Sequence, residues 1–319
     1  MREAVRRGYP TTAVVRDAAT AAAEPKFQGA SVVQADVSEP SQLASGPFAK
    51  GEVDVVISCL ASRSGSKKDS FKIDYQATLN CLEAARAAGA RHFVMLSAFC
   101  VKSAERNDKY ALQFQYAKKD MEAALRAQDD VSYTIVRPTA FFKSVSGQVE
   151  VVNGGAPFVY FDLGGGKCAT CNPISEPDLA AALVDTIADP SKKDALWNLG
   201  GPDDGLSMRE QGELVADVLG KEEAKMLGVP IGIFEPIINT LQWLGDTFKS
   251  EKLIDAAEFG RIGRYYAVVD MLTDDPADKY GKTTLRAHYE RIAVEGQEYD
   301  PYTSVFGGKQ KTEDYVGKK

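Results

Sequence analysis

Short apolar segments rich in β-branched residues alternate with helical patterns through the first half of this 319-residue chain. Helical patterns occur at 75–88 and 111–127. Strands are predicted at 11–15, 31–34, 54–58, 92–97 and 133–137. Strands separated by helices form parallel sheets with right-handed crossovers, and near-continuous apolar strands fit a sheet that is covered on both faces. The pattern therefore predicts a doubly wound α/β fold.

The first residues read MREAVRRGYPTTAVVRD, which we interpret as the end of an amphipathic helix, a stop at Gly8 and a strand ending at Arg16. This order is typical of the second half of a βαβ nucleotide-binding unit. The first strand and the glycine-rich phosphate loop of such a unit precede its helix. We therefore expect a Rossmann-type sheet that lacks both and is incomplete at its N-terminus. Such a chain would also lack the helix N-terminus that binds the pyrophosphate, and is expected to be inactive if that contact is essential.

The pattern becomes less regular after Pro138, and we divide the chain near that point. Residues 1–147 are predicted to form an NAD(P)-binding Rossmann-like domain. Residues 148–319 are predicted to form a smaller, mostly helical substrate-binding region, from which 177–200 return to the Rossmann sheet. The segment 229–248 is long enough to span a bilayer, but its polar residues favour a buried or interfacial amphipathic helix.

Composition excludes some classes of function. The formal net charge of −7 argues against a broad nucleic-acid-binding face, so we expect no nucleic-acid partner. The five cysteines are scattered in apolar contexts, which is typical of a reducing compartment. Cys168 and Cys171 lack the second pair of ligands that zinc needs, and two histidines give no basis for a catalytic metal. We predict no metal site.

Open α/β sheets bind ligands beyond the carboxyl ends of their strands, which indicates the cofactor residues. Arg16 follows the strand at 11–15, where a cation meets the 2′-phosphate of NADPH; a solvated surface arginine is the alternative. The other predicted cofactor contacts end the next two strands, beside the adenine and the nicotinamide ribose respectively. They are Asp36 and Val37, and then Cys59, Leu60 and Ala61.

The catalytic segment departs from the usual dehydrogenase pattern. Short-chain dehydrogenases place a Ser or Thr after the fifth strand of the complete sheet and Tyr-x-x-x-Lys on the next helix; here Ser97 and Lys118 match, but Phe114 replaces the tyrosine. Tyr116 lies on a different helix face. Phe114 has no proton to give to a developing alkoxide, so reduction of a conjugated carbon–carbon double bond fits better than carbonyl reduction. We predict that Lys118 holds the nicotinamide ribose; a surface helix lysine is the alternative.

Five segments carry a family resemblance that runs from about residue 1 to residue 296. They are HFVMLSAFCV, FQYAKKDMEAAL, YTIVRPTAFFKSVSGQVE, KCATCNPISEPDLAA and AAEFGRIGRYYAVVDML. In these five segments the chain resembles the NADPH-dependent 3,8-divinyl chlorophyllide 8-vinyl reductases of plants, algae and some photosynthetic bacteria. These are atypical short-chain dehydrogenases of the isoflavone-reductase-like, NmrA-like branch, and Phe114 is typical of them.

The resemblance implies an NADPH-dependent oxidoreductase acting on a CH–CH bond in chlorophyll biosynthesis. Its reaction converts the 8-vinyl group of divinyl chlorophyllide, or divinyl protochlorophyllide, to ethyl. It also implies a chloroplast enzyme, in the stroma or at the thylakoid or envelope surface, with peripheral association with plastid membranes.

A flat apolar macrocycle that bears a carboxylate needs aromatic or aliphatic faces and one or two cations. Phe141, Phe142 and Lys143 follow the strand at 133–137 and are predicted substrate contacts; core packing is the alternative for the two phenylalanines. Arg261 and Arg264 are a second candidate pair for the carboxylate. Their alternative is ion pairing with internal acids.

Two other functions stay open. Proteins of this branch include NAD(P)-binding redox sensors that regulate a partner without turnover. Reduction of another conjugated double bond, as in a phenylpropanoid, is the second alternative. Detection of monovinyl pigment would separate these readings.

Overall fold

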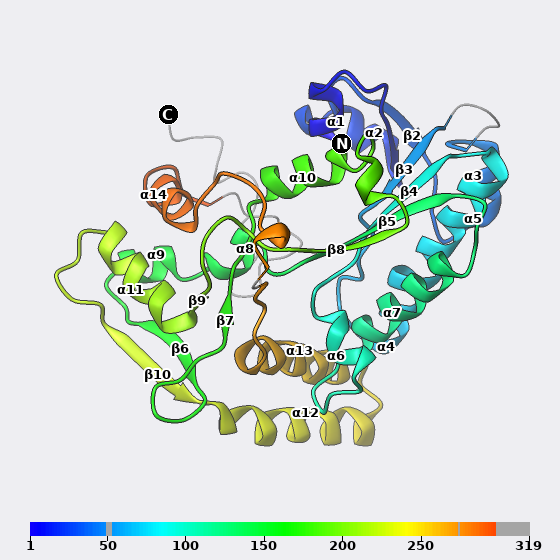
Figure 1. The fold of residues 1–319 in the computed structure, drawn as a ribbon. Coiled ribbons are helices and arrows are strands. Elements are labelled where there is room, and N and C mark those ends of the chain that lie inside the picture. Colours follow the sequence, from blue (N-terminus) through cyan, green and yellow to red (C-terminus); the bar gives the residue numbers. More distant parts are fainter. Residues whose placement is uncertain (49–52, 274, 298–319) are drawn as a thin grey trace.

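A four-stranded parallel sheet forms the centre of the computed structural model, which describes residues 1–48, 53–273 and 275–297 (Figure 1). Its strand order is β3–β4–β5–β8. The strands are β3 (Val55–Ser58), β4 (His92–Leu96), β5 (Ser132–Pro138) and β8 (Ala195–Leu199). Each neighbouring pair is parallel, with Val55 opposite His92 and His92 opposite Ser132. The predicted doubly wound α/β fold is confirmed.

Two further strands form a sheet of their own. β1 (Thr12–Val15) pairs in parallel with β2 (Ser31–Gln34), and in the described part of the chain no strand joins β1 to β3. The predicted Rossmann-type arrangement without its first strand therefore appears as a sheet divided between β1 and β3. The short helical segments around this pair are α1 (Arg2–Arg6), α2 (Ala18–Ala22), η1 (Pro25–Phe27) and α3 (Pro40–Ser45).

Helices cover both faces of the central sheet. One face is covered by a group that follows β3 and β4: α4 (Lys67–Ser70), the π-helical η2 (Phe71–Ala77), α5 (Thr78–Ala88) and α7 (Gln113–Arg126). The other face meets α10 (Glu176–Asp185), on which α1 packs. Two short elements, α6 (Val101–Glu105) and η3 (Pro190–Lys192), lie in the connections.

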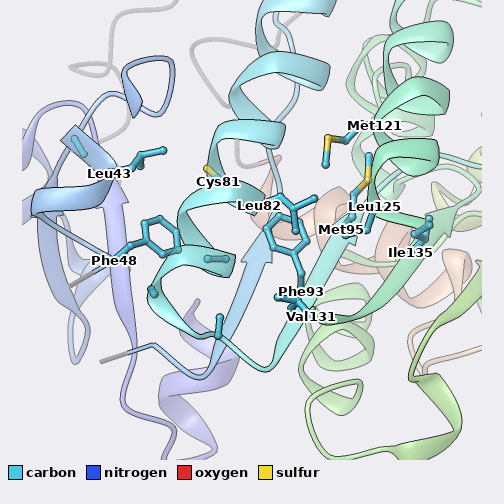
Figure 2. Close-up of a cluster of buried hydrophobic side chains, with 14 residues drawn as sticks. Leu43, Phe48, Cys81, Leu82, Phe93, Met95, Met121, Leu125, Val131 and Ile135 are labelled. Carbon is cyan, nitrogen blue, oxygen red and sulfur yellow. The ribbon is translucent and has the colours of Figure 1, made fainter. Parts of the chain in front are cut away.

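Alternate residues of β4 supply the two hydrophobic cores. Phe93 and Met95 are fully buried against Leu82 of α5 and Met121 of α7 (Figure 2). Val94 joins the cluster on the opposite face. Because successive side chains of a strand point to opposite faces, a strand buried on both faces must be apolar throughout, which explains the continuous apolar runs.

The remaining elements build a second region around its own buried cluster. β6 (Phe158–Asp162) pairs in parallel with β10 (Met226–Pro230), and β7 (Thr170–Cys171) pairs antiparallel with β9 (Leu206–Ser207). The helices here are α8 (Phe142–Val145), α9 (Val149–Asn153), α11 (Met208–Val218) and α14 (Leu285–Glu295). Two short turns lie outside this cluster: η4 (Ile231–Ile233), and η5 (Pro276–Asp278), which contacts β8 of the central sheet.

Two longer helices form a hairpin on the outside of the molecule. They are α12 (Phe234–Phe248) and α13 (Glu251–Val268). Glycine at position 245 allows the two helices to pack closely, because a Cβ there would come within 2.7 Å of the Ile254 side chain. The outer surface of α12 exposes Ile237, Trp243 and Phe248. Among the described helices, none combines the length and the hydropathy needed to cross a bilayer.

Candidate active site

Lys118 of α7 lies where β3 and β4 end. Its Nζ is 3.0 Å from Asp74 Oδ1, and it lies 3.4 Å from the carbonyl oxygens of both Leu60 and Leu96. The lysine side chain is only 7% exposed and that of Asp74 only 1%. Ammonium protons are directional donors, so these three acceptors fix the charged head at the carboxyl edge of the sheet.

Asp74 is a site residue that the sequence analysis did not predict. It belongs to the π-helical segment η2, and its second oxygen accepts a 3.1 Å hydrogen bond from the Ser62 backbone N–H. The spacing of Asp74 in the sequence could have indicated it, because positions 74, 78, 81 and 85 fall on one face of a helix. In the structure Thr78, Cys81 and Ala85 on that face are all buried. An acid on a buried helix face needs a partner, and a buried lysine is one.

A second carboxylate, Asp69, shapes the loop after β3. Its Oδ2 accepts from the backbone N–H groups of Arg63 and Ser64, at 3.0 and 3.1 Å. The same loop contains Gly65, whose φ of +66° favours glycine. A Cβ on Gly65 would also come within 2.6 Å of Ile262 Cδ1, so α13 lies directly against this loop.

The predicted catalytic Ser97 takes part in a buried ionic network. Its hydroxyl donates to Glu122 Oε1 over 2.5 Å. Arg137 donates to the same carboxylate through Nε at 2.8 Å and through Nη2 at 2.5 Å. Arg137 also pairs with Glu105, and that hydrogen bond lowers the pKa of the Glu105 carboxyl. The Ser97 hydroxyl therefore joins β4 to α7 and β5.

Phe114 belongs to an apolar cluster between α7 and α13. Buried members of this cluster include Phe99 and Tyr265. The Tyr265 hydroxyl lies 2.8 Å from Ser103 Oγ, and burial raises its pKa to about 12. The Tyr266 hydroxyl lies 3.9 Å from Cys100 Sγ, and burial of the hydroxyl raises its pKa well above the usual value. Both phenols therefore face the segment that follows β4.

The residues predicted to bind the cofactor lie at the carboxyl ends of their strands. Arg16 is exposed after β1. The amide and hydroxyl of Ser38 lower the pKa of Asp36, with a smaller contribution from the positive charge of Arg16. The Val37 carbonyl oxygen accepts from the Asn80 side chain at 3.1 Å.

Three more of these residues follow β3. Cys59 and Ala61 are exposed, and Leu60 is half-buried. Just before them, the buried Ser58 hydroxyl finds no hydrogen-bond partner among the described residues. The donor set fits the ribose and 2′-phosphate ends of a dinucleotide: an ammonium, an unpaired hydroxyl and an exposed guanidinium.

The residues predicted to contact the substrate divide into core and surface. Phe142 is fully buried, with its ring centroid 4.9 Å from that of His288, so it packs in the core. Phe141 is half-buried and forms a β-bridge with Ile174. Lys143 is exposed.

Both predicted carboxylate-binding arginines make internal pairs in the α12–α13 hairpin. Arg261 donates to Glu258 at 2.9 Å and to Gln242 at 2.8 Å. Arg264 donates to Glu235 at 2.7 Å and lies 4.5 Å from the centroid of the Tyr110 ring. Its Nε is buried without a partner among the described residues.

Comparisons with known proteins agree with this architecture. Residues 1–190 match a family model described as NAD(P)H-binding. The chain is 43% identical over 318 residues to divinyl chlorophyllide a 8-vinyl-reductase of Arabidopsis thaliana, covering 93% of this chain and 74% of that protein. It is 44% identical to the same reductase of Zea mays over 280 residues, 84% of this chain and 67% of the relative. The chain belongs to the divinyl chlorophyllide a 8-vinyl-reductase family. The predicted resemblance is confirmed.

Solved structures share the fold of this reductase family member at low sequence identity. An NADPH-dependent quinone oxidoreductase of Escherichia coli superposes with a TM-score of 0.62 at 18% identity, covering 91% of this chain and 94% of that one. A triphenylmethane reductase of Citrobacter gives a TM-score of 0.63 at 19% identity, covering 89% and 90%. Within the described residues of our chain, no group of three or more His, Cys, Asp or Glu side chains could hold a metal ion.

Proposed function

We propose that this protein reduces the 8-vinyl group of divinyl chlorophyllide to an ethyl group with NADPH, as a step in chlorophyll biosynthesis. Identity of 42–44% with four reductases of this name, over 84–93% of the chain, carries the proposal. The names of these relatives also describe them as chloroplastic, and we assign this protein to the chloroplast.

The chemistry requires two hydrogens to be added across a conjugated double bond. When bound, NADPH supplies a hydride to one vinyl carbon and is oxidised to NADP⁺, while a proton from solvent or a protein group adds to the other carbon. The macrocycle spreads the developing negative charge, so an acid in the position of Phe114 is not required.

Lys118 is the residue that we assign to the nicotinamide ribose. Its ammonium group lies between the ends of β3 and β4, next to the predicted contact residues Leu60 and Ala61. Ser97 supports this arrangement indirectly, because its bond to Glu122 holds α7 against β4. Arg16 is assigned to the 2′-phosphate, and Asp36 and Val37 to the adenine side.

We assign pigment binding to the loop after β3, the segment after β5 and α13. Phe141 and Lys143 would contact the macrocycle and its carboxylate from one side. Arg264 or Arg261 would bind the carboxylate from α13, after exchanging an internal acid for the substrate. Buried Arg264 Nε, which has no partner among the described residues, favours Arg264 of the two.

Peripheral contact with plastid membranes is part of the proposal. The outer surface of α12 exposes Trp243 at 64% and Phe248 at 70%. Exposed aromatic side chains of this kind partition into the interfacial zone of a bilayer.

The decisive test is conversion of divinyl to monovinyl pigment. Purified protein is incubated with divinyl chlorophyllide and either NADPH or NADH, and the pigments are separated by chromatography. We expect monovinyl chlorophyllide with NADPH and much less with NADH. NADPH binding without any monovinyl product would contradict the proposal and favour a non-catalytic NAD(P) sensor.

A further inference from the structure

We infer that Asp74 is a positioning residue of the cofactor site, which acts by holding Lys118 at the carboxyl edge of the sheet. This inference rests on the proposed role of Lys118 in binding the nicotinamide ribose. It adds a residue that neither the motif around Lys118 nor the family comparisons assign.

The first step is the location of Asp74. The π-helical segment η2 runs from Phe71 to Ala77 between α4 and α5, and it packs on α7. π-helical turns are rare and are found often at functional sites, because the extra residue in the turn redirects nearby side chains. Here the carboxylate of Asp74 is directed toward α7, with 1% of the side chain exposed.

The second step is the pair that the carboxylate makes. One oxygen of Asp74 lies 3.0 Å from Lys118 Nζ, and the other accepts from the Ser62 N–H at 3.1 Å. A single side chain thus connects the loop after β3 to helix α7. Two carbonyl oxygens, those of Leu60 and Leu96, lie 3.4 Å from the same Nζ.

The third step is what this pair does electrostatically. An ammonium group with so little exposure needs a counter-charge, because burial disfavours its charged form. Asp74 is the acid that forms an ion pair with Lys118 in the described structure. It therefore supplies the counter-charge for the lysine and keeps its Nζ directed to the strand ends. A ribose hydroxyl could then replace one of the long carbonyl contacts without moving the lysine.

The test measures NADPH binding without pigment, by titration of the protein's fluorescence. Asp74→Asn keeps the shape of the side chain and an oxygen for Ser62, but removes the charge. We expect it to weaken NADPH binding by about tenfold or more, as for loss of one partner of a buried charge pair. Asp130→Asn is the control, since it makes the same acid-to-amide change in an ion pair with Arg86 that lies outside the proposed site; it should leave affinity near that of the unaltered protein.

A double-mutant cycle separates positioning from a general structural effect. If Asp74 acts through Lys118, Asp74→Asn should cause little further loss of NADPH affinity in a Lys118→Met background. An unchanged affinity in Asp74→Asn, or an equal loss in both backgrounds, would overturn the inference.

A labelling experiment on the unaltered protein tests the position of Lys118 without relying on the folding of any variant. With limiting acetic anhydride, Lys118 should be acetylated much more slowly than the exposed Lys68, and NADPH should slow it further. Acetylation of Lys118 as fast as that of Lys68 would also overturn the inference.

Failure of the proposed function can be told apart from failure of this inference. If NADPH binding depends on Asp74 but no monovinyl pigment forms, the proposed function fails and this inference stands. An unaltered protein that does not bind NADPH would overturn both.

Discussion

Ser97 and Glu122 are joined by a buried hydrogen bond of 2.5 Å between the serine hydroxyl and Glu122 Oε1. Glu122 lies one helical turn after Lys118 on α7, so the two side chains share a face of the helix. The bond therefore ties the end of β4 to the helix that carries the proposed ribose-binding lysine. Arg137 of β5 completes the connection.

This arrangement predicts a modest loss of stability in Ser97→Ala. Glu122 keeps both hydrogen bonds from Arg137, so we expect the free energy of unfolding to fall by about 1 kcal/mol, with NADPH affinity nearly unchanged. Urea denaturation and NADPH titration measure the two quantities. Loss of turnover without loss of stability would instead indicate direct contact of Ser97 with the reacting groups.

Glu122→Gln should be far more damaging than Ser97→Ala. It leaves the buried Arg137 guanidinium with Glu105 as its remaining ion-pair partner in the described structure. Breaking a buried pair in this way costs about 3–5 kcal/mol of stability. Thermal unfolding followed by circular dichroism checks this. A variant as stable as Ser97→Ala would show that the network contributes little.

Arg16→Ala should change the choice of cofactor. Losing a guanidinium that binds the 2′-phosphate should weaken NADPH by about tenfold or more, and leave NADH affinity unchanged. Arg209→Ala on α11 is the control, because that arginine is half-exposed and pairs with Glu213 of the same helix. Equal losses for NADPH and NADH would place Arg16 away from the phosphate.

Glu235→Gln should improve pigment binding if Arg264 binds the substrate carboxylate. The change removes the acid that holds Arg264, a partly exposed pair worth up to about 1 kcal/mol. We expect the KM for divinyl chlorophyllide to fall about two- to fivefold, with kcat unchanged. The control Asp246→Asn alters another acid of α12, one that accepts from Gln242. An unaltered KM in Glu235→Gln would argue against a role for Arg264.

His288 should make the protein less stable in mild acid. Burial lowers its pKa from 6.5 to about 4, and its ring packs on Phe142 and bonds to Ser146. Between these values the unfolded chain binds a proton that the folded chain does not, so stability falls as the pH falls from 6.5 to 4. The loss attributable to this group is at most about 3 kcal/mol.

The measurement is the free energy of unfolding as a function of pH, compared with that of His288→Gln. The variant should lack this component of the pH dependence, so the difference between the two proteins should shrink toward pH 4. Parallel curves across the whole range would contradict the assignment.

Local patterns in the sequence predicted the elements well. Strand β2 has the predicted bounds, β1, β3 and β4 differ from theirs by one residue at one end, and β5 is longer by one residue at each end. The helix predicted at 111–127 is α7, and its spacing of Lys118 to Glu122 places both on one buried face. Local patterns could not separate Phe141 from Phe142. The two adjacent phenylalanines look alike in sequence, but the fold buries Phe142 completely.

Local patterns of the chain predicted the α/β class and a parallel sheet without its first strand, and the motif around Lys118 showed the departure at Phe114. The class and the order of strands and helices follow from periodicities of two and 3.6 residues, which are local properties of the chain. Tertiary packing brings Asp74 to Lys118, Ser97 to Glu122 and Arg264 to Glu235. Each of these contacts joins elements that are distant along the chain. Which charges meet depends on how helices pack and loops turn, and no local period encodes that.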